Sequence, residues 1–292
     1  MFRRMNQVLV ITLLILGGLA TANAQNSVEQ QKGFVFYESF QGSTNSEGQV
    51  MTLGSSATYW FNEHFSAGVG IPIYFDRSSS PTGTTSSNGI GNFYADLGAS
   101  WKSKTLNFAS SLTGAAPSGN TDKGLSTGHA TYDWSNRFDH AFSRLTPFGV
   151  IGIADTVMDS RFFQRPFSSF GSLAHFEGGA DVDLSHSFSL TLSAYDIAPW
   201  GRQTIISRLV PKGATGTGGQ NGRTFETTHQ ATGNSSLDHD DGFTVGLDFN
   251  PTNLKSAFDF DLGYNRSVPF ALNTISFGVG VNLSKLFSSS GK

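Results

Sequence analysis

The sequence predicts an all-β protein, a transmembrane antiparallel up-and-down β-barrel of about 12 strands. Twelve segments alternate apolar and polar residues with a period of two, which is typical of β-strands. The gaps between them are alternately short and mostly long, which fits short periplasmic turns and longer extracellular loops. Charged residues make up 14% of the chain, against roughly 25% in ordinary soluble domains. Such a deficit is expected where much of the surface faces lipid.

The N-terminus has the pattern of a secretory signal peptide. Arg3 and Arg4 precede the apolar stretch 8–20, and Ala22-Asn23-Ala24 provides a cleavage site. The apolar stretch is too short for a spanning helix of about 20 residues, and no other stretch approaches that length. We therefore predict a signal peptide over 1–24 and one barrel domain over 25–292. Removing the two arginines takes the formal net charge from −3 to −5, which gives no reason to expect nucleic acid as a partner.

The alternation defines each predicted strand. It is clearest from Phe65, where apolar residues occupy the odd positions up to Phe75 and mostly small or polar residues lie between. The segment from Phe93 to Trp101 repeats the pattern. In order, the predicted strands cover 33–40, 50–61, 64–76, 90–102, 104–114, 129–138, 145–156, 171–184, 187–200, 241–250, 256–266 and 271–284. Most of them are long enough to cross a bilayer, which takes about 9–11 residues in a tilted strand.

The gap lengths orient the predicted barrel. Short turns follow the even-numbered strands, at 62–63, 103–105, 139–144, around 186 and at 251–255. Longer gaps follow most odd-numbered strands, at 41–49, 77–89, 115–128, 157–170 and 201–240, whereas the last one, 267–270, is short. An even strand count places both termini in the periplasm. A soluble sandwich is the alternative, but it gives no reason for loop length to alternate.

The strand count has alternatives of ten and fourteen. Strands 33–40 and 145–156 blur the alternation, and the longest loop contains a candidate hairpin at 204–210 and 224–228. The last strand resembles the C-terminal signal by which bacterial barrel proteins engage their insertion machinery, with Phe287 continuing its parity. An ordinary final strand is the alternative. We therefore expect the insertion machinery and outer-membrane lipid as partners, and the outer membrane as the location.

Residues of the polar parity are expected to line the interior, because a charge facing lipid costs about 2–4 kcal/mol for basic residues and less for acids. The predicted lumen-lining residues are Asp96, Asp133, Arg137, Glu177, Asp181, Asp183, Asp248, Asp259 and Asp261. Lys102 and His175 share this parity and complete the set. Eight are acids, against the two bases Arg137 and Lys102. Rings of acids favour cations, so the sequence predicts a cation-favouring lumen. The alternative is a narrow lumen that these side chains fill structurally.

Two segments resemble a known family. Gly89-Ile90-Gly91-Asn92-Phe93-Tyr94 resembles the Gly-x-Gly-Asp-x-Tyr opening of a strand in the outer-membrane family named for the meta-pathway of phenol degradation. The loop 113–120, followed by 123–128, is similar to the family's Pro-Thr-Gly-Asp loop and its Leu-Gly-Thr-Gly. Ser118 and Asn120 stand where the family has Thr and Asp. The resemblance implies a porin-like channel for small, often hydrophobic or aromatic compounds.

The same loop is a candidate constriction. Pro117 ends a strand pattern, and Gly119 and Asn120 suit tight loop conformations. We list Pro117, Gly119 and Asn120 as constriction candidates if the loop folds inward. A solvated surface loop is the alternative.

No enzyme chemistry and no cofactor or metal are predicted. His175 and Ser172 lie two residues apart on a strand, and no third group orients them. Asp238-His239-Asp240-Asp241 lacks the EF-hand spacing, which favours a solvated acidic turn over a Ca²⁺ site. The glycine-rich stretch 216–222 lacks the dinucleotide fingerprint and suits a flexible loop.

The most direct hypothesis for function is passive passage of small solutes. The alternative is a non-conducting surface barrel whose long loops bind a partner or mediate adhesion. The loop 201–240 motivates it, since loops longer than about 12–15 residues are usually functional or disordered. No residue set specifies the solute.

Overall fold

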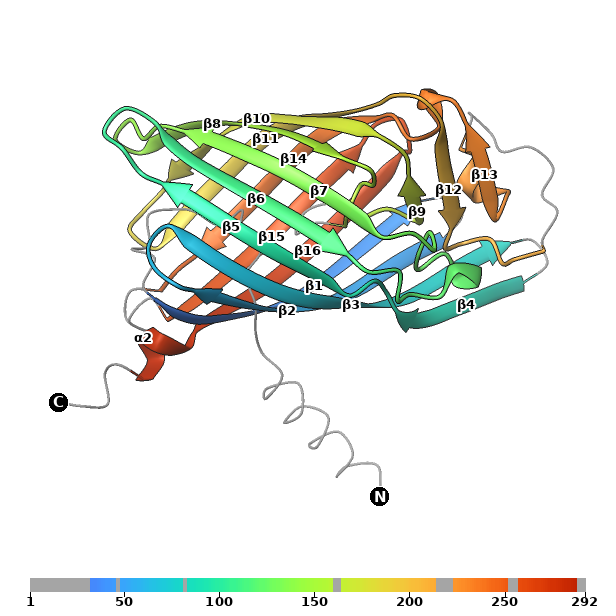
Figure 1. The fold of residues 1–292 in the computed structure, drawn as a ribbon, viewed down its shortest axis with the longest axis horizontal. Helices are drawn as coiled ribbons and strands as arrows, with labels where there is room; N and C mark the ends of the chain where they lie inside the picture. Colours follow the sequence, from blue (N-terminus) through green and yellow to red (C-terminus); the bar gives the residue numbers. More distant parts are fainter. Residues whose placement is uncertain are drawn as a thin grey trace, which may run out of the picture.

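In a computed structural model the chain forms a closed antiparallel barrel of twelve strands (Figure 1). The structure describes residues 32–45, 48–80, 83–159, 164–213, 223–251 and 257–287. The predicted signal peptide and the glycine-rich stretch 216–222 lie outside the described residues. In the part of the chain that is described, no helix is long and apolar enough to cross a membrane.

The barrel wall follows the chain order. Its strands are β1 (Gly33–Asn45), β2 (Gly48–Trp60), β3 (Phe65–Ser80), β5 (Tyr94–Trp101), β6 (Asn107–Ala115), β7 (Thr131–Asp139), β8 (Leu145–Ala154), β10 (Leu173–Asp183), β11 (Phe188–Pro199), β14 (Asp240–Phe249), β15 (Phe258–Ser267) and β16 (Leu272–Asn282). Each strand pairs with the next, and β1 pairs with β16 to close the barrel. The predicted fold class and twelve-strand count are confirmed.

One predicted strand begins too early. The pattern predicts a strand over 90–102, but β5 begins at Tyr94, and Ile90 ends β4 (Gly83–Ile90). β4 pairs with residues 73–80 of β3, and β5 pairs with residues 65–70. Between them the Gly91 N–H donates to the Pro72 carbonyl at 2.8 Å. A Cβ at Gly91 would lie 2.4 Å from the Tyr74 ring, so the chain passes here only because this residue is glycine.

The prediction of long loops at 41–49 and 77–89 is wrong, because most residues in these two ranges belong to strands. The β1–β2 hairpin continues to Asn45 and Gly48, and the β3–β4 hairpin to Ser80 and Gly83. Ser, Thr and Gly dominate these stretches. Backbone hydrogen bonds continue the ladder without an apolar face. Pairing therefore extends beyond the point where the hydrophobic alternation stops.

The short turns and the C-terminal end of the described chain lie at one end of the barrel, which we call the turn end (Figure 1). Here β16 ends at Asn282, and Leu283–Phe287 form the short helix α2. The Asn282 side chain accepts a hydrogen bond from the Lys285 N–H at 3.1 Å, as a helix N-cap does. The predicted continuation of the strand through Leu283 to Phe287 is therefore wrong.

The outward face of the wall is apolar. Large exposed side chains occupy alternate positions, among them Phe40, Leu97, Leu262 and Ile275. Near the turn end, aromatic rings meet across β3, β5, β6 and β7, in contacts that join Phe65 to Trp101, Trp101 to Phe108 and Phe108 to Phe138 at centroid distances of 5.8, 5.9 and 5.2 Å. An apolar face with an aromatic girdle is what a barrel in lipid presents.

The opposite end, which we call the loop end, carries a second sheet. β9 (Phe167–Phe170), β12 (Gln203–Ser207) and β13 (Gln230–Gly233) form this three-stranded inner sheet (Figure 1). The described residues of the loops around it include the 3₁₀ turns η1 (Thr121–Lys123), η3 (Thr224–Glu226) and η4 (Ser235–Leu237). Its apolar side packs in a buried cluster of Phe167, Ile205, Phe225, Phe270 and Leu272.

The predicted hairpin in loop 201–240 is only half right. β12 covers part of 204–210, but its partner is β13, whereas 224–226 form a 3₁₀ turn. β9 lies in the predicted loop 157–170 and pairs with β12. Strands of four or five residues offer too few alternating positions for a period of two to be visible.

Candidate functional site

The predicted charged residues lie on the strand faces opposite the exposed apolar residues. Asp96 is on β5, Asp133 and Arg137 are on β7, Glu177, Asp181 and Asp183 are on β10, Asp248 is on β14, and Asp259 and Asp261 are on β15. Asp183 is exposed at the turn end, whereas Asp181 and Asp261 are buried. Lys102 instead lies in the exposed turn after β5, so its assignment to the lumen is wrong. The strand had been expected to continue to that residue.

Arg137 is neutralised by carboxylates on two strands. Its Nη2 lies 2.7 Å from Asp181 Oδ2, and its Nε lies 3.4 Å from Asp139 Oδ2. The guanidinium carbon lies 3.8 Å from the centroid of the Phe148 ring, a cation–π contact. The Thr191 hydroxyl donates to the other Asp181 oxygen at 2.7 Å. These contacts join β7, β8, β10 and β11 on the inside of the wall.

A second polar contact crosses a glycine. His175 Nε2 on β10 lies 3.0 Å from Asp133 Oδ1 on β7, although β8 separates the two strands. Gly152 of β8 lies beneath them, and a Cβ there would be 2.2 Å from His175 Nε2. The missing side chain is therefore what lets the two residues meet.

The same arrangement recurs on the other side of the barrel. The Tyr37 hydroxyl of β1 donates to the Asp261 carboxylate of β15, across β16. A Cβ at Gly278 of β16 would lie 2.1 Å from the Tyr37 hydroxyl oxygen. Asp248 lies directly opposite Asp261 in the β14–β15 register, which places two acids side by side.

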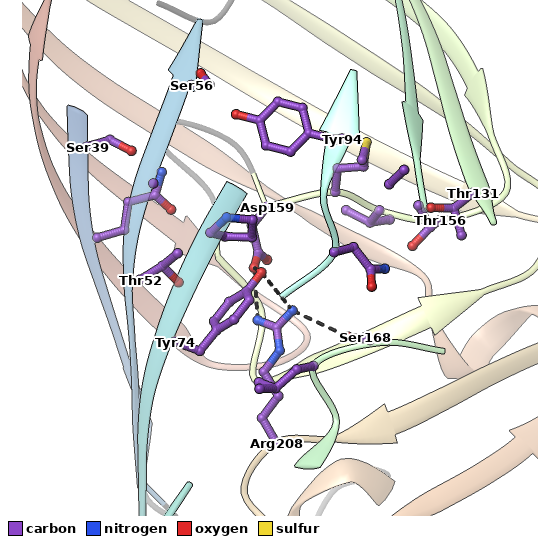
Figure 2. Close-up of a pocket in the computed structure, with 18 of the residues that line it drawn as sticks. Ser39, Thr52, Ser56, Tyr74, Tyr94, Thr131, Thr156, Asp159, Ser168 and Arg208 are labelled. Atoms are coloured by element: carbon purple, nitrogen blue, oxygen red, sulfur yellow. Dashed lines mark hydrogen bonds and ion pairs between the residues drawn. The ribbon is translucent and has the colours of Figure 1, made fainter. Parts of the chain in front are cut away.

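A cavity of about 120 Å³ lies inside the barrel (Figure 2). Hydroxyl groups from β1, β2, β3, β5 and β7 surround it, and they share the wall with segments that enter from the loop end. Its polar lining comprises Tyr37, Ser39, Gln41, Thr52, Ser56, Tyr74, Asn92, Tyr94, Thr127, Thr131, Thr156, Asp159, Ser168 and Arg208. None of the predicted lumen charges is among these residues.

Arg208 fixes the loop-end side of the cavity. Its Nη1 lies 2.9 Å from Asp159 Oδ2 and donates to the Arg165 carbonyl at 2.7 Å. Its guanidinium carbon lies 4.1 Å from the Tyr74 ring centroid, and Figure 2 shows the side chain turned toward Tyr74 and Asp159. Burial lowers the pKa of Arg208, but Asp159, Tyr74 and Asp76 raise it by more, so its pKa is above the ordinary value. Arg208 therefore stays charged.

Arg165 holds a second buried ion pair beneath the inner sheet. Its Nη1 pairs with Asp238, and its Nη2 lies 3.3 Å from Asp240 Oδ2. All three side chains are almost fully buried. The predicted solvated acidic turn is therefore wrong, because a basic residue from a distant loop draws both carboxylates inward. Burial raises the pKa of Asp238, although Arg165 opposes that rise.

The constriction candidates shape a loop whose later residues reach the cavity. Pro117 and Asn120 are exposed, and the Asn120 side chain caps η1. A Cβ at Gly119 would lie 2.4 Å from the Leu125 carbonyl. Leu125 is 2% exposed and lines the cavity together with Thr127. The loop thus enters the barrel through Leu125 and Thr127, whereas Pro117 and Asn120 line no part of the cavity.

Sequence reasoning missed most of the cavity residues. Tyr94 has the same parity as Asp96, so it could have been assigned to the lumen from the pattern alone. Tyr37 lies in the strand where the alternation is blurred. Arg208 and Asp159 lie in predicted loops, where no periodicity indicates a direction.

No protein-family model and no curated protein matches the chain. Among solved structures, the COG4313 outer membrane channel from Pseudomonas putida F1 is similar with a TM-score of 0.57 at 10% identity, over 90% of this chain and 99% of that one. A NanC porin has a TM-score of 0.46 at 9% identity, over 85% and 99% of the two chains. The Pseudomonas putida toluene transporter TodX has a TM-score of 0.45 at 11% identity, over 93% of this chain and 95% of that one.

At 10% identity, the likeness to the COG4313 channel shows a shared fold. The chain thus has the fold of a twelve-stranded barrel similar to an outer membrane channel. The resemblance to the family named for phenol degradation stays a prediction, as does the role of the lumen charges.

Proposed function

We propose that the protein is an outer-membrane channel for passive passage of small solutes, exported through the signal peptide 1–24. The observation that carries this proposal is a cavity lined by both hydroxyl groups and apolar side chains, inside a closed barrel whose outward face is apolar. In this orientation the turn end faces the periplasm and the loop end faces outward, as short turns and longer loops are arranged in such barrels.

The size of the cavity suits one small molecule. A cavity of roughly 150 Å³ accommodates benzene in an engineered protein. The cavity here, about 120 Å³, is of that order. Its tyrosine rings offer faces for stacking, and its hydroxyl groups offer hydrogen bonds. Both suit the small aromatic compounds that the family resemblance implies. The inner sheet narrows the loop end, so larger solutes should be excluded.

The electrostatics of the lumen favour cations. Eight of the predicted lumen residues are acids, and Arg137, the base among them on the barrel strands, is paired with Asp181 and Asp139. Acidic rings attract cations and repel anions of the same size. We propose that this excess ranks cations and neutral molecules above anions in passage.

Liposome swelling tests this proposal. Refolded protein is placed in vesicles and challenged with neutral aromatic, cationic and anionic solutes of matched size. We expect swelling with the neutral and cationic solutes and slower swelling with the anionic ones. Vesicles without protein provide the baseline. Equal exclusion of all three classes would contradict the channel and favour a non-conducting surface barrel.

The surface-binding alternative has less support. Ile205, Ile206 and Ser207 of the longest loop are 1–2% exposed, so this part of the loop packs in the barrel interior. Residues 214–222 lie outside the described part of the chain. Deleting 205–236 separates the two functions. A channel should keep or raise its conductance, whereas a surface binder should lose its ligand while the barrel stays folded.

A further inference from the structure

Five polar residues form one row across five adjacent strands at the loop end. Direct register partners link Arg77 on β3 to Gln49 on β2, and Gln49 to Thr44 on β1. The row continues from Thr44 to Asn273 on β16 and from Asn273 to Arg266 on β15. We call these five residues the rim row.

The rim row faces outward. In each strand the neighbouring residue points inward and is almost fully buried: Asp76, Val50, Ser43, Thr274 and Asn265 are 1–3% exposed. Successive side chains of a strand point to opposite faces. Arg77, Gln49 and Thr44 are exposed, and Asn273 and Arg266 are partly exposed.

The rim row borders the apolar band. Two residues nearer the turn end, the outward positions of the same strands are Phe75, Met51, Gly42, Ile275 and Tyr264. Phe75 is 40% exposed and Ile275 61%. The outward side chains therefore change from apolar to polar within one step along the strands. Lipid headgroups lie at such a boundary.

An arginine lies at each end of the rim row. We call the outward surface between these two arginines the basic face. The Arg266 Nη1 donates to Asn273 Oδ1 at 3.1 Å, as does the Tyr264 hydroxyl at 2.8 Å, which orients the guanidinium along the wall. Four strand spacings of about 4.8 Å separate Arg77 from Arg266, or roughly 19 Å. Outward-facing acids occur on the next strands: Asp241 of β14 lies directly opposite Asp196 of β11 in the strand register. These acids mark the edge of the basic face.

We propose that the rim row binds the phosphates of the anionic glycolipid in the outer leaflet of the membrane. Arginine recognises phosphate through two parallel hydrogen bonds, and a basic residue near an anionic membrane surface is attracted to it. Gln49, Thr44 and Asn273 lie between the arginines and offer hydrogen bonds to the sugar. The proposal rests on the orientation given under Proposed function but not on the passage of any solute.

Native mass spectrometry of the full chain tests the proposal. Protein in neutral detergent is titrated with lipid A, the diphosphorylated glycolipid, and separately with phosphatidylglycerol and phosphatidylcholine. We expect lipid A to bind most tightly, and the double variant Arg77→Gln/Arg266→Gln to bind it at least about tenfold more weakly. Replacing both arginines with lysine should recover part of the affinity, because lysine keeps the charge and loses the paired geometry.

Arg144→Gln is the matched control, since Arg144 is an exposed arginine in a turn at the other end of the barrel. It should bind lipid A like the parent. Equal binding by the parent and the double variant would overturn the proposal, and so would an equal loss in Arg144→Gln. Equal affinity for phosphatidylglycerol would overturn the choice of glycolipid. Swelling with solutes should be the same in all variants, so a failure here is distinguishable from a failure of the channel.

Discussion

At the residue scale, inward-facing glycines decide which polar side chains meet. Gly152 lies under the His175–Asp133 contact, and Gly278 lies under the contact of Tyr37 with Asp261. Each glycine belongs to the strand between its two partners. This arrangement lets polar side chains meet across the strand that lies between them.

Replacing Gly152 with alanine should break one of these bridges. The new Cβ would lie 2.2 Å from His175 Nε2, and the Trp134 carbonyl is 2.8 Å away on the same side. We expect a loss of about 1–3 kcal/mol in the free energy of unfolding. Urea unfolding in vesicles, followed by tryptophan fluorescence, measures it. Gly178→Ala is the control, because a Cβ at Gly178 meets nothing within 4 Å. Equal unfolding midpoints for the two variants would contradict this role of Gly152.

At the element scale, buried ion pairs hold the inner sheet in the loop end. Arg165 precedes β9 and binds Asp238 and Asp240, which connects the sheet to the start of β14. Arg208 follows β12 and binds Asp159 near the end of β8. The sheet also shares a cluster of buried aromatic residues with the β15–β16 loop. Its position should therefore depend on both the charges and the apolar contacts.

Arg165→Met should loosen the inner sheet. The change leaves two buried carboxylates without their cation, which typically costs about 3–5 kcal/mol. We expect faster amide hydrogen exchange at 203–207 and a higher conductance. Arg202 is exposed and directly precedes β12, so Arg202→Gln should change neither the exchange at 203–207 nor the conductance. Unaltered exchange in Arg165→Met would show that the ion pair does not hold the sheet.

The stability of the inner sheet in Arg165→Met should depend on pH. Burial raises the pKa of Asp238 above its ordinary value, so the folded state binds the proton more tightly than the unfolded state. Stability is therefore present at low pH and is lost as pH rises from about 3.9 through the raised value. Without Arg165, acidification should slow the exchange at 203–207 again. Exchange that stays fast in acid would contradict this reasoning.

The wall strands were predictable and the inner sheet was not. Eight or more alternating residues, as in β3 and β16, make a period of two visible. The lumen charges follow from the same parity, which placed Asp133 and Glu177 on the inward face. Glu38 breaks the rule: it shares a parity with the exposed Phe34 and Phe40, and its carboxylate accepts from the Ser55 hydroxyl at 2.9 Å. That outward carboxylate is why the first strand blurred the pattern.

The buried arginines had no signal in the sequence. Arg165 and Arg208 lie in stretches where polar residues, prolines and short strands leave no periodicity. Their partners are 73 and 49 residues away along the chain, so only the closed barrel brings them together. The cavity, which Arg208 helps to line, could not be derived without that closure.

At the scale of the whole molecule, the lumen has two chemically different sides. The cavity hydroxyls come mainly from β1 to β7, whereas most of the lumen acids lie on β10, β14 and β15. A solute that passes the inner sheet would thus lie between a hydroxyl-rich wall and an acidic wall. We propose that this asymmetry would give a barrel of modest net charge a preference for cations.

Single-channel recording in planar bilayers tests that central claim most directly. We expect discrete conductance steps and, in a salt gradient, a reversal potential that shows cation preference. Asp248→Asn/Asp261→Asn should move that potential toward zero, because it removes two adjacent lumen acids. Asp122→Asn, at an exposed position in η1, should leave it unchanged. The absence of steps, or an anion preference in the parent protein, would contradict the account.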